Sequence, residues 1–204
     1  MSGLAVSRRH LSYTRLLAPR SVDIVDLAVI HCTELPDLAT ARAYGERVVY
    51  PGSGTGSGPG FDPGSGTGNS GHFYIERDGS TEEWVPVERI AHHVRGFNER
   101  SVGIELVNSG RFPGWFDSRR QVMGEPYPAA QVEALAQLLR ELSKTLPHLR
   151  WIAGHDALDT GYVSATDDPD RRVRRKLDPG PLFPWSELLA EVPLVRFEPD
   201  VPGV

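Results

Sequence analysis

The chain has 204 residues, of which 39% are hydrophobic and 24% charged, with a formal net charge of −5 at pH 7. This length suits a single domain with a sizeable core, and the apolar share excludes a wholly disordered chain. No apolar run approaches the roughly 18 residues of a membrane-spanning helix, the single cysteine excludes an internal disulfide framework, and the mild acidity argues against binding nucleic acid through bulk charge.

Residues 1–22 form a basic N-terminal arm that holds four arginines and no acidic residue. Polar and basic side chains interrupt each short apolar stretch, so the continuous apolar segment of a secretory signal is missing. A solvated tail is the expected state of this arm, and contact with the domain or with an anionic surface is the alternative. The sequence therefore predicts a cytoplasmic protein.

The first strong strand signal is the run 26–31, Asp-Leu-Ala-Val-Ile-His, and modest helix signals follow over 39–49. Residues 51–71 then contain nine glycines and three prolines, which excludes a helix or a central strand. Pro-Gly-Ser-Gly-Thr-Gly at 51–56 recurs at 63–68. We interpret the stretch as one lengthened loop, which a fold tolerates because closure entropy rises slowly with loop length.

Two strand-like runs, 72–77 and 80–87, flank the dipeptide Asp78-Gly79 and predict a β-hairpin. Residues 101–107, Ser-Val-Gly-Ile-Glu-Leu-Val, predict another strand.

The longest predicted helix covers 128–146, where leucines recur at helical spacing behind a proline suited to the first turn. A short strand over 151–153 follows, and residues 193–204 are expected to be a loose tail. Strands and helices in this order predict one α/β domain over 23–192, with a mixed central β-sheet flanked by helices.

Two of the seven histidines, His31 and His155, stand at the ends of predicted strands, where sites gather in open α/β sheets. Asp178 follows in the segment Lys-Leu-Asp-Pro-Gly-Pro at 176–181. Two histidines and a carboxylate, with a fourth position left open, make a ligand set of catalytic zinc sites. The spacing leaves two readings open, a metal site or two ordinary packed histidines.

Glu105 and Lys176 are the other unusual positions. Glu105 interrupts an apolar strand pattern; it either faces solvent or, if buried, is costly unless paired or used, as a general base beside a metal-bound water would be. Lys176 ends an arginine-rich run in a chain with 20 arginines and two lysines. A solvated basic patch needs no lysine there, so a role specific to a compact ammonium is favoured.

Five segments occur in an order that resembles a known family: Val29–Thr33, Gly71–Gly79, Ser101–Leu106, Gly154-His155 and Lys176–Pro181. Together they resemble the zinc-dependent N-acetylmuramoyl-L-alanine amidases of the AmpD type, which share a fold with bacteriophage amidase lysozymes and peptidoglycan recognition proteins. The resemblance covers roughly residues 23–185.

This resemblance implies a zinc ion held by His31, His155 and Asp178. It also implies that Glu105 activates the metal-bound water and that Lys176 stabilises the developing oxyanion.

Three further positions gain an interpretation from the same resemblance. His93 matches a histidine that lines the substrate groove, while His92 stands where relatives often have tryptophan. Gly71 stands where phage relatives have tyrosine, which fits the branch that relies on the strand glutamate.

The implied activity is hydrolysis of the amide bond between the lactyl group of N-acetylmuramic acid and L-alanine, in peptidoglycan or soluble muropeptides. One alternative is a non-catalytic peptidoglycan-binding module, although such relatives typically lose a metal ligand and all three are kept here. The other is a zinc hydrolase of a different amide, because fold alone does not fix the substrate.

Overall fold

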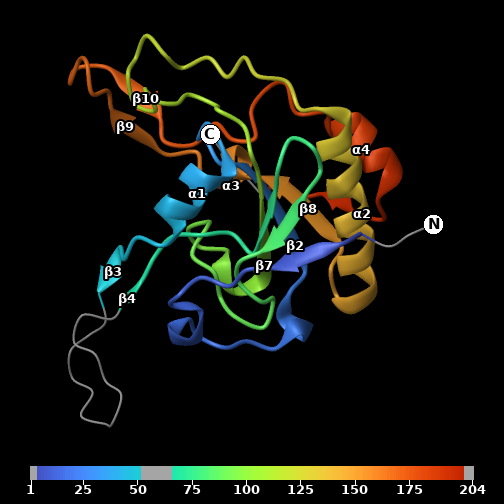
Figure 1. The fold of residues 1–204 in the computed structure, drawn as a ribbon. Helices are drawn as coiled ribbons and strands as arrows, with labels where there is room; N and C mark the ends of the chain where they lie inside the picture. Colours follow the sequence, from blue (N-terminus) through green and yellow to red (C-terminus); the bar gives the residue numbers. More distant parts are fainter. Residues whose placement is uncertain (1–3, 52–65, 200–204) are drawn as a thin grey trace, which may run out of the picture.

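The computed structural model describes residues 4–51 and 66–199 (Figure 1). Its α-helices are α1 (Leu38–Gly45), α2 (Ala129–Thr145), α3 (His155–Leu158) and α4 (Trp185–Glu191), with single 3₁₀ turns at Thr14–Leu16, Val22–Ile24 and Asn98–Arg100. Its strands are β1 (Val6–Arg8), β2 (Leu27–Cys32), β3 (Tyr50–Pro51), β4 (Gly66–Thr67), β5 (Phe73–Ile75), β6 (Thr81–Glu83), β7 (Ser101–Leu106), β8 (Trp151–Gly154), β9 (Tyr162–Ser164), β10 (Arg172–Arg174) and β11 (Val195–Arg196).

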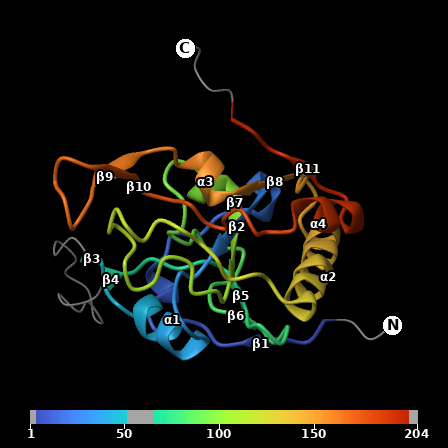
Figure 2. The same ribbon diagram turned by 90° about the horizontal axis from the view of Figure 1, so that it is seen from above.

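Seven strands form one mixed sheet in the order β1-β6-β5-β7-β2-β8-β11. Strands β5, β7, β2, β8 and β11 run parallel to one another, whereas β6 is antiparallel to β5 and carries β1 alongside it in parallel. Helices α2 and α4 lie together on one side of the sheet, and α1 and the β9–β10 hairpin lie on the other (Figures 1 and 2). The mixed central sheet with flanking helices is the architecture that the sequence predicts.

Helix α2 covers one face of the sheet and forms the main core. Its leucines project from one stripe and are buried against side chains of β2, β5 and β7, among them Ile30, Ile75 and Ile104. Burying each aliphatic side chain of this kind stabilises the folded state by about 1.5–3 kcal/mol relative to leaving it exposed. This packing fixes the orientation of the sheet, so alternate residues of the same strands face the opposite side.

That opposite face of the sheet carries the polar residues of interest. On β2, Leu27 and Val29 belong to a cluster separate from the α2 core, and His31 continues their alternation. On the neighbouring strand β7, Ser101, Gly103 and Glu105 are the register partners of these three residues. The two central strands thus present one row of side chains each toward the same side.

The predicted hairpin is present, with shorter strands than expected. Gly79 has a φ of +88°, a conformation that favours glycine, and the Asp78 carboxylate accepts the backbone N–H of Ser80. Eight of the twelve residues in the two hexapeptide copies of the loop 51–71 lie outside the described residues. Strands β3 and β4, which flank that undescribed stretch, pair antiparallel.

The N-terminal segment differs from the solvated arm expected from its charge. Strand β1 pairs with β6, and Leu11, Tyr13 and Leu17 are buried in a core cluster. Buried Arg20 donates to the backbone carbonyls of Val87, Asn98, Glu99 and Ser101 at 2.7–3.0 Å. The apolar side chains between the arginines therefore pack this segment against the domain.

The expected loose tail also differs, because β11 pairs with β8 and Leu194 is buried. Two residues are too short to give a recognisable strand pattern, and the pairing depends on a neighbour more than 40 positions away in the sequence. Among the described residues, no helix is long and apolar enough to cross a membrane.

Candidate metal centre

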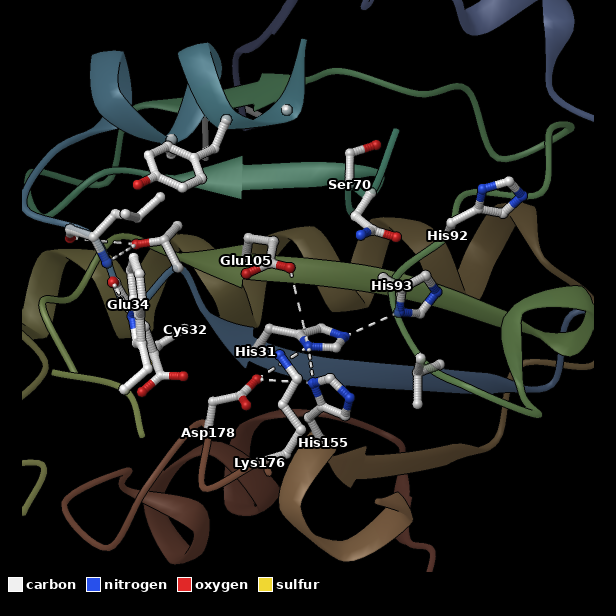
Figure 3. Close-up of a pocket in the computed structure, with 18 of the residues that line it drawn as sticks. His31, Cys32, Glu34, Ser70, His92, His93, Glu105, His155, Lys176 and Asp178 are labelled. Carbon is white, nitrogen blue, oxygen red and sulfur yellow. Dashed lines mark hydrogen bonds and ion pairs between the residues drawn. The ribbon is translucent and has the colours of Figure 1, made fainter. Parts of the chain in front are cut away.

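Three buried side chains converge beyond the ends of two central strands (Figure 3). His31 is the penultimate residue of β2, and His155 begins α3 directly after β8. The register pairs Ile30 with Gly154, so the two histidines stand at the same level. Asp178 comes from the loop after β10. Its Oδ2 lies 3.1 Å from the Nδ1 atoms of both histidines, which are themselves 2.9 Å apart.

These three atoms fit a zinc ion. Ligands that bind tetrahedral zinc at about 2.0–2.2 Å stand about 3.3 Å from one another, close to the sides of this triangle. The second oxygen of Asp178, Oδ1, is buried without a hydrogen-bond partner among the described residues. A buried carboxylate with an unpaired oxygen is costly unless a cation balances it.

The surroundings also set the protonation states that a metal requires. Burial, aided by the neighbouring His155, lowers the pKa of His31 to about 4. Burial alone would raise the pKa of Asp178, but His155, Lys176 and the short contacts of its carboxylate with both imidazole rings hold it well below its usual value. Near neutral pH, His31 is therefore neutral and Asp178 is ionised, which are the forms that bind metal ions.

Glu105 faces this cluster from the adjacent strand. It is the register partner of His31, and its Oε1 lies 4.0 Å from His31 Nδ1. Burial and the nearby charge of Asp178 raise the pKa of Glu105 well above its usual value, and Lys176 partly opposes this. Gly71 leaves space for the carboxylate, because a Cβ at that position would stand 2.9 Å from Glu105 Cγ.

Lys176 reaches into the same space from below the cluster in the view of Figure 3. Its side chain is half-buried, and its charge lowers the pKa of His31, Glu105 and Asp178. Within residues 4–51 and 66–199, no carboxylate lies within 4.0 Å of its amine. The ammonium is thus near three site residues without being held in an ion pair there.

A buried ion pair supports the chain that leads to Lys176. Arg111 binds Glu34 through two hydrogen bonds of 2.7 and 2.9 Å, and both side chains are almost fully buried. Arg111 also donates to the backbone carbonyls of Arg174 and Arg175 at 2.9 and 3.3 Å. The sequence analysis missed this pair, because neither residue stands in a recognisable pattern and their contact spans 77 positions.

The two adjacent histidines, His92 and His93, both line the cavity but contact different residues. Nδ1 of His93 lies 2.9 Å from Nε2 of His31. His92 packs edge-on against Tyr50, with ring centroids 5.0 Å apart. A role for His93 in substrate binding stays a prediction, while its contact with a candidate ligand was not foreseen.

The cluster opens into a cavity of about 580 Å³, within the range of small-molecule sites. Its lining includes aromatic and cationic side chains, namely Tyr44, Tyr50, Tyr74, Trp115, Phe116, Arg95 and Arg175. Aromatic faces and guanidinium groups suit a ligand that has both apolar and anionic parts.

The Amidase_2 family model, described as N-acetylmuramoyl-L-alanine amidase, matches residues 21–181. The chain belongs to this amidase family. It is 33% identical to N-acetylmuramoyl-L-alanine amidase AmiD of Escherichia coli over 112 residues, covering 51% of this chain and 35% of AmiD. It is 30% identical to 1,6-anhydro-N-acetylmuramyl-L-alanine amidase AmpD of Salmonella typhimurium over 133 residues, covering 61% of this chain and 58% of AmpD.

The chain also shares its fold with a solved structure of E. coli AmiD in complex with anhydro-N-acetylmuramic acid-L-Ala-D-γ-Glu-L-Lys. The TM-score is 0.58 at 23% identity, covering 85% of this chain and 60% of the other. In each of these comparisons the match spans less than two thirds of the relative's own length.

Proposed function

We propose that this chain is a zinc-dependent amidase that cleaves the bond between the lactyl group of N-acetylmuramic acid and L-alanine in peptidoglycan or muropeptides. The observation that carries the proposal is the triangle of His31, His155 and Asp178 with Glu105 in register beside it, at the base of a cavity in a member of this family. A relative's structure with an anhydro-muramyl tripeptide supports a muropeptide as substrate.

In this proposal His31, His155 and Asp178 hold the zinc ion, which when bound polarises the amide carbonyl and lowers the pKa of a water molecule toward roughly 7. Glu105 acts as general base, because its raised pKa makes it a stronger base than an exposed glutamate. It accepts the proton of the attacking water and then delivers it to the leaving amide nitrogen.

Lys176 acts on the carbonyl oxygen of the substrate rather than on the attacking water. As the carbonyl carbon becomes tetrahedral, negative charge develops on its oxygen, and an ammonium already in place stabilises that charge without reorganising. The aromatic walls of the cavity would hold the sugar, and Arg95 and Arg175 at the same cavity would face the carboxylates of the stem peptide. A cytoplasmic site of action stays a prediction.

The test is digestion of soluble anhydro-muropeptides and of whole sacculi by the purified, zinc-loaded chain, followed by mass spectrometry. We expect release of the stem peptide with a free L-alanine amine, loss of cleavage after chelation, and recovery after zinc is added back. Cleavage of only one substrate would assign the protein to fragment recycling or to wall degradation.

Three results would contradict the proposal. Intact lactyl–alanine bonds in both substrates, despite zinc in the protein, would exclude the activity. Muropeptide binding without cleavage and without zinc would favour a non-catalytic module. Cleavage of a different amide bond by the zinc-loaded protein would show that it is a zinc hydrolase with another substrate.

A further inference from the structure

The second ring nitrogen of His31 makes a contact that the proposed chemistry does not use. While Nδ1 of His31 faces His155 and Asp178, Nε2 lies 2.9 Å from Nδ1 of His93 (Figure 3). A histidine can offer one nitrogen to a metal only if its proton sits on the other nitrogen. The partner of that other nitrogen therefore decides which atom of His31 is available.

The direction of this hydrogen bond follows from the residues behind His93. The Oγ of Ser101 lies 3.2 Å from Nε2 of His93, and its single proton is donated to the backbone carbonyl of Phe97 at 2.8 Å. The serine oxygen is thus left to accept, so Nε2 of His93 carries the proton. Its Nδ1 is then an acceptor, and His31 must donate from Nε2.

Two features hold the ring of His93 at this place. Gly103 lies beneath it on β7, where a Cβ would come within 2.6 Å of both Cγ and Nδ1 of the imidazole. The backbone N–H groups of His93 and Val94 both donate to Oδ1 of Asn98, at 3.0 and 2.8 Å. The loop and the sheet therefore fix the ring from two sides, and only glycine at position 103 leaves room for it.

We propose that His93 is a positioning residue, which accepts the Nε2–H of His31 and so keeps Nδ1 of His31 directed at the metal, with Ser101 and the Phe97 carbonyl fixing the direction. Alternate residues of β7 then serve one site: Ser101 orients His93, Gly103 makes space for it, and Glu105 faces the reacting atoms. The inference rests on the proposed zinc centre, but it needs no particular substrate.

The test compares zinc affinity, measured by competition with a chromophoric chelator, in three variants. His93→Phe keeps a ring and removes the acceptor, so we expect zinc to bind about 10–100-fold more weakly. His93→Gln offers an amide oxygen as acceptor and should recover part of that loss. Ser101→Ala should weaken binding in the same direction by less, and the neighbouring His92→Phe should bind zinc as wild type does.

A second readout is independent of activity. In ¹⁵N spectra of the zinc-loaded protein we expect His93 to carry its proton on Nε2, and His31 to show a slowly exchanging Nε2–H that is lost in His93→Phe. Melting temperatures would show which variants fold; should His93→Phe fail to fold, His93→Gln and Ser101→Ala decide.

Unchanged zinc affinity in folded His93→Phe would overturn the inference and leave His93 with a role in the substrate groove. So would a His93 ring protonated on Nδ1. A wild-type protein that binds zinc but leaves muropeptides intact would refute the proposed activity alone, because neither readout involves substrate.

Discussion

Glu105 and His31 are register partners on the two central parallel strands, and 4.0 Å separates the carboxylate Oε1 from the imidazole Nδ1. Because the strands are paired along six residue pairs, the backbone positions of both residues are set by the sheet rather than by a flexible loop. Glu105 and one candidate metal ligand are therefore held by the same rigid pair of strands, as a site that requires ångström-scale placement needs.

This relationship predicts that Glu105→Gln removes activity without removing the metal. The amide is nearly isosteric but accepts no proton, so we expect turnover to fall by about 10²–10⁴-fold. Elemental analysis should still find one zinc per chain. Glu133→Gln, an exposed position on α2, is the matched control and should retain full turnover. A normal rate for Glu105→Gln would remove Glu105 from the mechanism.

Gly71→Ala should act through Glu105. The added Cβ would stand 2.9 Å from Glu105 Cγ and 3.1 Å from the Gly103 carbonyl oxygen, so the carboxylate must shift. We expect kcat to fall by roughly 10²-fold while zinc stays bound. Gly124→Ala is the control, because a Cβ there meets no atom within 4 Å. Equal kcat values for the two variants would show that the space beside Glu105 is not needed.

Lys176→Arg tests whether the site needs an ammonium or only a positive charge. A planar guanidinium has a different reach and geometry from the compact lysine amine, so we expect kcat/KM to fall by about 10²–10³-fold. Lys144→Arg, at an exposed position on α2 that pairs with Glu141, should behave as wild type. Turnover of Lys176→Arg close to wild type would show that charge alone suffices.

Arg111→Met should destabilise the fold and disturb the segment before Lys176. Removing one partner of a buried ion pair costs about 3–5 kcal/mol, because Glu34 would stay buried without its counterion. Urea unfolding should show this loss. Arg119→Met, which breaks an exposed contact with Asp117, should leave the free energy of unfolding close to the wild-type value. Similar values for both variants would contradict the prediction.

The parts of the fold that the sequence predicts are those with a periodic apolar pattern. Strands β2 and β7 and helix α2 agree with the predicted ranges to within a residue or two at either end. Strands β1 and β11 have two or three residues and pair with distant partners, so their pattern carries no signal. Helix α1 ends at Gly45, earlier than the predicted range, which continued to residue 49.

Some residues of the candidate site could also be predicted from the sequence, and others could not. Glu105 and Lys176 could be singled out because each breaks a local trend, an apolar strand or a run of arginines. That His31, His155 and Asp178 meet could not be derived from spacing, because they span 147 positions and only the sheet register and one loop bring them together. The acceptor role of the His93 ring depends on Ser101 and Gly103, which are ordinary residues in the sequence.

The family match begins at residue 21, yet the folded unit begins earlier. A protein trimmed to that boundary would lose β1 and leave the edge of β6 open to pairing with other chains. It would also lose the guanidinium of Arg20, which ties three carbonyls around the Asn98 turn and the start of β7, next to the loop that carries His93. The family match therefore begins inside the folded unit, and the contacts of β1 and Arg20 show that residues before position 21 are part of it.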